Sequence, residues 1–516
     1  MNTISKNTEE SQSGFYKLPD GWVWIILKDV SNISDRDHTT PKYEDSGYPL
    51  ISPKIFTDYG IDISKAKYVG DKEYSAFEKK CNPEKGDLLY SRIGTIGEVR
   101  LLDFDYKFVA LHSIALIKPN YGFTCSKYLL YLMQSLNIKH QAIGNVQSVG
   151  VPDLGLKRMK NFSIPLPPLA EQHRIVEKIE EEFTRLDAGV KALKHAKALI
   201  PKYRQSVLKS AMCGDITKEW RALHPDVESA EVLIEKIIKY KKDLIKKSII
   251  KPQKNVKNID LEKKPFALPN SWIWQRWDTI SLKIGDVDHK MPEESNNGIP
   301  YVSPKNFHGI NEINFEKAKK ISVEDFERLK VKIQPECGDL IFPRYGTIGE
   351  NRLVITDDNF LASYSCAVIK CLNRYLNQKY VYYYSISPLV KLEIQKYVNE
   401  TTQANVGLKS IQIFIFPLPP LEEQHEIVCE IERRFSIIDE MERVVNESLL
   451  KAERLRQSVL KKAFEGRLVS QNPDDEPAGV LLERIQAEKE LRAAEGKANG
   501  KKKSAGKKKV KKADAE

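Results

Sequence analysis

The 516-residue chain contains the same unit twice, and this duplication constrains the fold more than any other feature of the sequence. Short motifs of the first half return in the second half in the same order, at offsets of 250 to 252 residues. Because so many collinear matches do not arise by chance, the sequence predicts two copies of one architecture. The matched pairs are Leu18–Trp24 with Leu268–Trp274, Ile51–Lys54 with Val302–Lys305, Gly86–Glu98 with Gly338–Glu350, Pro165–His173 with Pro417–His425, and Arg204–Lys209 with Arg456–Lys461.

The two copies are not equally similar along their length. The segment from Pro165 to Lys209 matches its counterpart densely, whereas residues 57–84 and 308–336 have diverged almost completely. A segment kept constant in both copies performs the same task twice, and a segment that varies on a constant frame is suited to recognising two different things. The duplication therefore predicts a shared scaffold that carries two different recognition surfaces.

Each copy is predicted to begin with a globular domain of mixed helices and strands. Short apolar runs bounded by Gly, Asp and Lys indicate strands, and two longer segments have helical spacing. The globular parts are therefore expected to belong to the α+β class. The expected strands include residues 87–90, 108–111, 114–117, 339–342 and 366–369, and the expected helices cover residues 125–136 and 375–387.

After each Pro-Leu-Pro-Pro motif, apolar residues recur at steps of three, four or seven, which is typical of a coiled coil. Long helices are predicted at residues 169–214 and 421–466, with Gly214 and Gly466 as their stops. Two such stripes in one chain most simply bury each other, and a two-fold relation would make the helices antiparallel. The alternative is partial burial of each helix against its own domain. The stripes are Ile175, Ile179, Phe183, Leu186, Val190, Leu193, Ile200, Val207 and Ala211, and Ile427, Ile431, Phe435, Ile438, Met441, Val445, Leu455, Val459 and Ala463.

The remaining boundaries follow from these helices. Globular domains are expected at residues 1–168 and 266–420, a short helix and linker at 215–265, and a C-terminal helix at 467–495. Within residues 215–265, the Lys- and Ile-rich stretch Lys236–Lys264 is predicted to be the linker. Residues 496–516 are a Lys-rich tail that we expect to be disordered. This tail supplies much of the formal net charge of +11, so the body of the chain is nearly balanced.

No catalytic, nucleotide-binding or metal-binding motif is found in the sequence. Glycine-rich phosphate loops, H-E-x-x-H, G-x-S-x-G and the (Asp/Asn)-Pro-Pro-(Tyr/Phe) motif of an adenine methyltransferase are all missing. The seven cysteines contain no C-x-x-C pair, which indicates reduced thiols and no zinc site. No apolar run approaches the ~20 residues that a membrane helix needs. The N-terminus has no secretion signal, so a cytoplasmic location is expected.

The sharpest local motif is Arg-x-Gly-Thr-Ile-Gly, which follows a predicted strand in each copy. Glycines let the backbone turn tightly, and an arginine can make a bidentate contact with phosphate or guanine. The alternative is a β-turn whose arginine pairs with a neighbouring acid. Lys54 and Lys305, in Ser-Pro-Lys motifs, are weaker candidates, with a structural turn and a solvent-facing lysine as the alternative. The candidate nucleic-acid contacts of the loops are Arg92, Gly94, Thr95, Gly97, Arg344, Gly346, Thr347 and Gly349.

Taken together, these motifs resemble those of the specificity subunits of type I restriction-modification systems. Each copy opens on Leu-Pro-x-x-Trp, carries Gly-Asp-Leu-(Leu/Ile)-x-x-Arg-x-Gly-Thr-Ile-Gly, and closes on Pro-Leu-Pro-Pro-Leu-x-Glu-Gln before the long helix. The resemblance extends from about Leu18 to Glu490. It implies two pseudo-two-fold-related α/β target recognition domains, separated by two long antiparallel coiled-coil helices, each domain reading one half of a split DNA sequence.

The resemblance also implies the partners of the chain. Double-stranded DNA would be the target, two modification subunits would use S-adenosylmethionine, and restriction subunits would use ATP and Mg²⁺. This chain would then hold no cofactor and have no catalytic residue of its own. Glu171, Gln172, Glu423 and Gln424, in the first turns of the long helices, are candidate contacts with the modification subunits. Two alternatives are a specificity subunit of a methylation-only system and a duplicated protein-protein scaffold that does not bind DNA.

Overall fold

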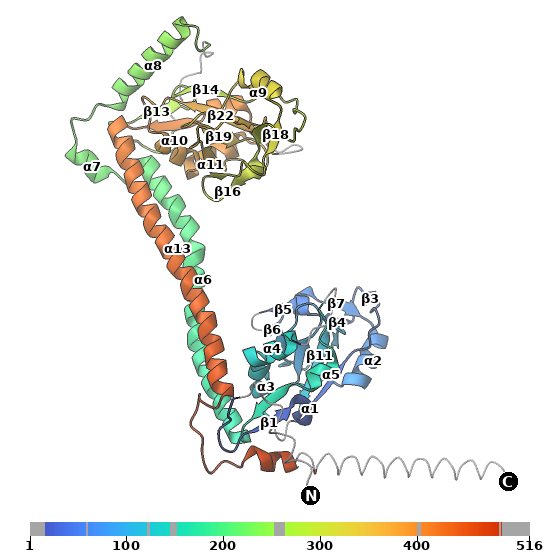
Figure 1. Ribbon diagram of the computed structural model, residues 1–516. Helices are drawn as coiled ribbons and strands as arrows, with labels where there is room; N and C mark the ends of the chain where they lie inside the picture. Colours follow the sequence, from blue (N-terminus) through green and yellow to red (C-terminus); the bar gives the residue numbers. More distant parts are fainter. Residues whose placement is uncertain are drawn as a thin grey trace, which may run out of the picture. The chain divides into compact units, whose positions relative to one another are not determined.

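The chain divides into two structural units. The first unit comprises residues 1–193 and 447–516, and the second comprises residues 194–446. Each unit contains one globular domain and parts of both long helices, α6 (Leu169–Cys213) and α13 (Leu421–Phe464) (Figure 1). The computed structural model describes residues 16–57, 60–120, 124–144, 152–251, 264–399, 404–484 and 487. The predicted tail and residues 252–263 of the predicted linker lie outside these ranges.

An antiparallel sheet with the order β2-β11-β8-β9 forms the centre of the first domain. Because β11 runs antiparallel to both of its neighbours, its first residues lie beside the last residues of β2 and β8. Ala115 pairs with Asp35, and Ile114 pairs with Ser91. The loops that follow β2 and β8 therefore emerge at one edge. The strands are β2 (Ser31–Asp35), β8 (Leu88–Ser91), β9 (Val99–Leu101) and β11 (Ile114–Pro119).

Further strands and short helices complete the first domain. A mixed sheet has the order β10-β4-β7-β3, and the first and last strands of the domain, β1 and β12, pair with each other. The strands are β1 (Val23–Ile26), β3 (Tyr43–Glu44), β4 (Tyr48–Ile51), β5 (Phe56–Thr57), β6 (Gly60–Ile61), β7 (Lys67–Val69), β10 (Val109–Ala110) and β12 (Ser163–Leu166). The helices are α1 (Leu27–Val30), η1 (Pro53–Ile55), η2 (Ile63–Lys65), α2 (Asp71–Cys81), α3 (Ser126–Met133), α4 (Leu136–Ile143) and α5 (Leu156–Lys160).

The second domain repeats this arrangement, as the duplication predicts. Its central sheet has the order β14-β22-β19-β20, the counterpart of β2-β11-β8-β9. The strands are β13 (Ile273–Arg276), β14 (Ser281–Gly285), β15 (Ile299–Val302), β16 (Phe307–His308), β17 (Glu312–Ile313), β18 (Lys319–Ile321), β19 (Leu340–Pro343), β20 (Arg352–Leu353), β21 (Leu361–Ala362), β22 (Cys366–Cys371) and β23 (Ile415–Leu418). The helices are α7 (Lys218–Leu223), α8 (Ala230–Lys246), η4 (Pro304–Asn306), α9 (Val323–Lys330), α10 (Gln378–Ser385), α11 (Pro388–Tyr397) and α12 (Leu408–Gln412).

In each unit, a segment of α6 packs against a segment of α13 (Figure 1). In the first unit, Ile175 and Ile179 of α6 share a core with Val459 and Ala463 of α13 and with residues of the globular domain. In the second unit, residues near the end of α6, including Ile200 and Val207, share a core with residues near the start of α13. This pairing of early with late residues confirms the predicted antiparallel arrangement, and the shared core shows that each helix is also buried against a domain.

An arginine joins the two helices in each unit. Arg456 of α13 pairs with Asp187 of α6, and its guanidinium carbon lies 4.1 Å from the centroid of the Phe183 ring. In the second unit, Arg204 of α6 pairs with Asp439 of α13 and lies 5.3 Å from the centroid of the ring of Phe435. The same contact is thus made twice, with the roles of α6 and α13 exchanged, as expected for a duplicated antiparallel pair.

Three details of the predicted elements were wrong. Residues 467–477, predicted to begin the C-terminal helix, are not helical, and helical structure resumes only at Ala478. Met441 and Leu455, assigned to the buried stripe, are 51% and 52% exposed, because a helix of 3.6 residues per turn rotates away from a 3.5-residue repeat. The linker predicted from Lys236 begins too early, since α8 continues to Lys246. The Nζ of Lys241 donates to the backbone oxygens of Asp278 and Ser281, both at 2.9 Å, which fastens α8 to the domain.

The glycine stops of the long helices were predicted correctly. Gly214 and Gly466 have φ values of +79° and +68°, in the left-handed region that side chains disfavour. Both positions are also crowded. A Cβ on Gly466 would lie 2.2 Å from Cγ of Pro19, and a Cβ on Gly214 would lie 2.6 Å from Cγ of Pro269. Each glycine therefore ends its helix and also lets the Leu-Pro motif of the following or preceding domain pack closely.

Candidate functional site

The Arg-x-Gly-Thr-Ile-Gly segments form exposed turns at the ends of β8 and β19. Gly94 and Gly97 have φ values of +78° and +100°, and the equivalent Gly346 and Gly349 have +72° and +83°. Gly94, Thr95, Gly346 and Thr347 are exposed, whereas Gly97 is buried. No atom outside the neighbouring residues lies within 4 Å of a Cβ placed at Gly94 or Gly346. Glycine is therefore required there by the backbone conformation and not by crowding.

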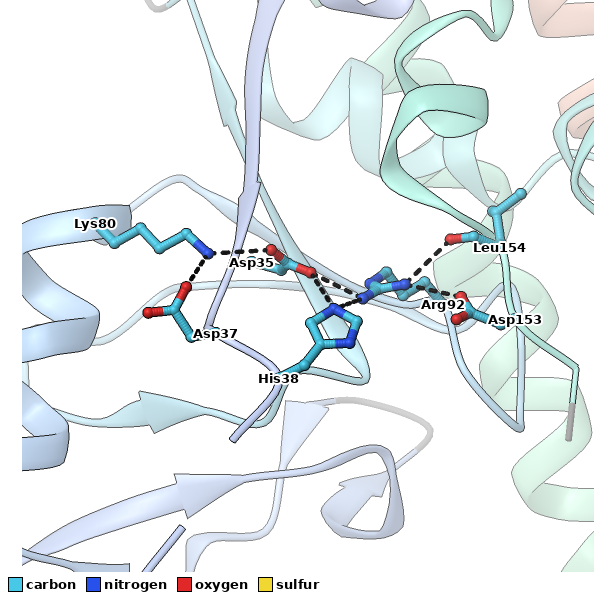
Figure 2. Close-up of polar contacts among 7 residues, drawn as sticks. All are labelled: Asp35, Asp37, His38, Lys80, Arg92, Asp153 and Leu154. Carbon is cyan, nitrogen blue, oxygen red and sulfur yellow. Dashed lines mark hydrogen bonds and ion pairs between the residues drawn. The ribbon is translucent and has the colours of Figure 1, made fainter. Parts of the chain in front are cut away.

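Arg92, at the start of the first turn, is 2% exposed and holds several loops together (Figure 2). Its Nη2 donates to Oδ2 of Asp35 at 2.8 Å, and its Nη1 donates to Oδ1 of Asp153 at 2.8 Å. Nη2 also lies 2.9 Å from Nε2 of His38. These four residues are called the arginine cluster below. Pairing of the arginine with neighbouring acids, the alternative prediction, is confirmed, and the buried Arg92 guanidinium is not presented directly to a ligand.

The second domain contains the equivalent cluster. Arg344 is 6% exposed, pairs with Asp286 and donates from Nε to the backbone oxygen of Val406 at 3.0 Å. His289 lies 3.6 Å from Asp286, measured from Nε2 to Oδ2. Asn405 takes the place of Asp153, and both form an isolated β-bridge with the residue that follows the arginine. Both arginines thus hold the loop edge of their domain from within.

Sequence analysis missed the Asp-x-Asp-His turns that supply the partners of these arginines. Asp35-Arg36-Asp37-His38 returns as Asp286-Val287-Asp288-His289 at an offset of 251 residues, so the duplication itself held the signal. A lysine also recurs, since Nζ of Lys80 lies 2.7 Å from Oδ1 of Asp37, and Lys332 pairs with Asp288. The hydrogen bond and charge of Lys80 hold the pKa of Asp37 below its usual value.

Each histidine of these turns lies beside an aromatic ring that differs between the domains. The rings of His38 and His112 have centroids 5.2 Å apart, and those of His289 and Tyr364 are also 5.2 Å apart. Burial is the main cause that lowers the pKa of His112. The framework is therefore shared by the two domains, while the groups around it differ. At three equivalent positions the first domain has Ile93, His112 and Asp153, where the second domain has Tyr345, Tyr364 and Asn405, respectively.

Lys54 and Lys305 are exposed and lie in the short helices η1 and η4. The alternative prediction of a structural turn with a solvent-facing lysine is confirmed for both. In the second domain, the turn is fastened by Asn306, whose Oδ1 accepts from the backbone nitrogen of Ser303 at 3.0 Å. Their contact with DNA stays a prediction.

Glu171 and Gln172 lie inside their own unit, at the joint between the domain and α6. Glu171 is 1% exposed and accepts from Nε1 of Trp22 at 2.9 Å and from Nε2 of Gln471 at 3.1 Å. Gln172 accepts from the backbone nitrogen of Cys125 at 2.9 Å. Burial raises the pKa of Glu171. The structure thus places both side chains at the joint.

The second copy builds the same joint. Glu423 is 1% exposed and accepts from Nε1 of Trp272 and from Oγ1 of Thr217, both at 2.7 Å. Gln424, fully buried, accepts from the backbone nitrogen of Asn377 at 2.9 Å. Burial again raises the pKa of the glutamate, here Glu423. The Leu-Pro-x-x-Trp and Pro-Leu-Pro-Pro-Leu-x-Glu-Gln motifs therefore contact each other in both copies, and the predicted contact of the four residues with modification subunits stays a prediction.

Comparison with known proteins decides the family. The model of the type I restriction modification DNA specificity domain matches residues 19–194 and 278–449, which is more than half of the chain. The chain belongs to this family. The type I restriction enzyme EcoBI specificity subunit of Escherichia coli is 27% identical over 68% of this chain and 69% of its own length. The EcoKI specificity subunit of Escherichia coli strain K12 is 25% identical over 95% of this chain and 99% of its own length.

Solved structures support the fold of this specificity subunit. The crystal structure of the HsdS subunit from Thermoanaerobacter tengcongensis has 20% sequence identity and a TM-score of 0.51, and the match covers 88% of this chain and 99% of that chain. A chain from a structural study of complex assembly and conformational transition of the type I restriction-modification system has a TM-score of 0.59 at 20% identity, over 88% and 100% of the two chains. The two globular parts are target recognition domains, and the specificity subunit, itself non-catalytic, confers recognition of the DNA target.

Two other kinds of site are absent from the described residues. In the described part of the chain, no group of three or more His, Cys, Asp or Glu side chains is arranged to hold a metal ion. None of the helices among the described residues is both long and apolar enough to cross a membrane.

Proposed function

We propose that the chain recognises a bipartite double-stranded DNA site, with one half read by each target recognition domain. The observation that carries this proposal is the shared frame of Arg92 and Arg344, surrounded by residues that differ between the domains. A protein that read the same half-site twice would not need different neighbours around a shared frame. The difference between the two target recognition domains therefore favours a DNA site with two different halves.

Contacts with DNA are proposed for the exposed parts of the glycine turns. Thr95 and Thr347, with Gly94 and Gly346, would approach the DNA, because backbone N–H groups and threonine hydroxyls bind phosphate oxygens and base edges. Gly97 and Gly349 would shape the turn, and Arg92 and Arg344 would fix its position from within. Lys54 and Lys305 would contribute phosphate contacts, which set position but not sequence.

We further propose that two modification subunits and restriction subunits assemble with this chain. A structure of a type I restriction-modification system in which a similar chain takes part supports this assembly. S-adenosylmethionine, ATP and Mg²⁺ would then be bound by the partners. A methylation-only system would share everything except the restriction subunits. Cleavage of unmethylated DNA by the complex purified from its host would separate these two cases.

Binding of DNA by the complex with modification subunits tests the proposal directly. We expect binding to duplex DNA to weaken steeply with salt, since log K falls by about 0.9 per log unit of salt for each phosphate contact. Mapping of N6-methyladenine in host DNA should then reveal two different half-sites with a constant gap. Absence of salt-sensitive duplex binding would favour the protein-protein scaffold instead.

A further inference from the structure

The turn that follows β2 presents an imidazole beside the proposed reading loop. The side chain of His38 is 61% exposed, although Asp35, three residues earlier, has a side chain that is only 8% exposed. Arg92, whose Nη2 contacts the His38 ring, is the first residue of the Arg-x-Gly-Thr-Ile-Gly turn (Figure 2). The imidazole and the exposed turn are therefore held by the same guanidinium, at the same edge of the domain.

The contact with Arg92 determines which nitrogen of His38 carries the proton. A guanidinium has N–H donors and no acceptor, so the 2.9 Å contact between Nη2 and Nε2 requires Nε2 to accept. In a neutral imidazole the other ring nitrogen then carries the hydrogen. The described part of the chain gives Nδ1 of His38 no hydrogen-bond partner. Arg92 thus turns His38 into a hydrogen-bond donor through Nδ1.

Charged groups surround this imidazole. Asp35 lies 3.4 Å from Nε2, and Arg92 balances that carboxylate. Lys80, which lies on the neighbouring helix α2, pairs with both Asp35 and Asp37. The ring of His112 lies beside His38 at 5.2 Å between centroids. Since the carboxylates are engaged by lysine and arginine, the position does not repel an anionic ligand as two free carboxylates would.

The second domain repeats the turn, but the groups around its histidine differ. The side chain of His289 is 64% exposed, and its Nε2 lies 3.6 Å from Oδ2 of Asp286. The ring of Tyr364 takes the place of His112 beside it. Both domains thus keep a histidine at the same edge, and the ring beside it differs. This pattern is expected for a residue that makes the same contact with DNA in two domains that recognise different sequences.

We propose that His38 and His289 contact DNA, each in the half-site that its own domain reads. The ligand chemistry is a hydrogen-bond acceptor of the duplex, either a phosphate oxygen or an acceptor on a base edge. For His38 the donor is Nδ1–H, held in place by Arg92. This inference rests on the proposed function, because it names a contact within the same recognition surface.

The experiment measures the affinity of the complex with modification subunits for its mapped DNA site. His38→Ala should weaken binding by about three- to tenfold, the value of one net hydrogen bond. Asparagine can place an N–H where the imidazole Nδ1 lies and glutamine cannot, so His38→Asn should recover affinity and His38→Gln should not. His224→Ala is the control, since His224 is exposed and stacks on Trp220 of α7.

Duplexes with single base changes distinguish the two sources of the acceptor. If the acceptor is on a base, His38→Ala should relax discrimination between bases at one position of one half-site. His289→Ala should do the same at one position of the other half-site. A phosphate contact predicts a uniform loss over all sequences. Wild-type affinity of both alanine variants, with unchanged thermal unfolding, would overturn this inference alone. Failure of the wild-type complex to bind duplex DNA would instead overturn the proposed function.

Discussion

At the scale of single residues, the buried arginines decide how firmly each loop edge is held. The side chains of Arg92 and Asp35 are 3% and 8% exposed, whereas that of Asp153 is 44% exposed. Removing one partner of a buried ion pair leaves an uncompensated charge, which costs far more than the loss of a solvent-exposed pair. The two carboxylates bonded to Arg92 should therefore contribute very unequally to the stability of the first unit.

Asp35→Ala should lower the free energy of unfolding of the first unit by about 3 kcal/mol. Asp153→Ala should lower it by under about 1 kcal/mol, because water can replace its carboxylate. Urea unfolding followed by tryptophan fluorescence measures both changes. Asp105→Ala is a matched control, since Asp105 pairs with Lys85 at 3.7 Å on the surface. Equal losses for Asp35→Ala and Asp153→Ala would contradict the assigned burial of the pair.

A second prediction concerns His112, whose pKa is lowered mainly by burial. The His112 imidazole of the folded state is therefore protonated less readily than in the unfolded state, in which histidine has a pKa of about 6.5. Stability of the first unit should therefore be greatest above that value and should fall as the pH drops through and below it. His112→Tyr, the residue of the second copy, should remove part of this dependence. Thermal unfolding at about pH 7.5 and 5.5 checks it, with His224→Tyr as the control.

At the scale of elements, the glycines that end the long helices have two roles: each adopts a left-handed backbone conformation, and each leaves room for a proline ring. Gly466→Ala and Gly214→Ala introduce a Cβ at a left-handed backbone position and against a proline ring. Each substitution should destabilise its unit by at least about 1 kcal/mol. Gly189→Ala, within α6 and with open space around its Cβ, should instead stabilise by about 0.5–1 kcal/mol. Circular dichroism during thermal unfolding measures the three changes, and a loss at Gly189 would contradict this account.

The length of the helix pair leads to a prediction about DNA spacing. A helix of 45 residues, such as α6, is about 68 Å long at 1.5 Å per residue. Insertion of one helical turn near both Lys197 and Ser448 adds about 5.4 Å, or one to two base pairs at about 3.4 Å each. We expect the gap between half-sites to lengthen while both halves stay the same. Methylation of a library of sites measures this gap, and an unchanged gap would argue against the helices as a spacer.

Some elements could be predicted from the sequence because their cause is local or periodic. The long helices follow from apolar spacing and from Gly214 and Gly466, and the observed helices end within two residues of these stops. The extent of α8 was missed, because its lysine-rich surface resembles a linker, and its burial depends on contacts distant in sequence. The exposure of Met441 and Leu455 was missed for a related reason, since helix drift becomes visible only when both partners are placed.

The candidate site was predictable only in part. The glycine turns were located, since their motif is repeated and directly follows a strand. The burial of Arg92 depends on Asp35 and Asp153, which lie 57 and 61 residues away in the chain. Glu171 and Glu423 were interpreted as partner contacts from the family resemblance and from their place in the first turns of the long helices, although charged residues can be buried when they have partners. Their partners, Trp22 and Trp272, could be recognised only from the folded structure.

At the scale of the whole molecule, duplication predicts that the two readers act independently. A chain in which residues 16–168 are replaced by residues 266–420 keeps the Trp–Glu joint, because both copies provide it. We expect such a chain, assembled with modification subunits, to methylate a site built from two copies of one half-site. Sequencing of methylated DNA measures the outcome. Methylation at the original asymmetric site would show that the domains do not read separately.

The joint between domain and helix has a consequence for how such genes diversify. The tryptophan that opens each domain and the glutamate in the first turn of each long helix are hydrogen-bonded inside one unit, and both lie within stretches of sequence that recur in the two copies. Recombination at those stretches would exchange everything between them and still restore the same buried contact. The chain could thus acquire a new target recognition domain in a single genetic crossover, without passing through an unstable intermediate protein.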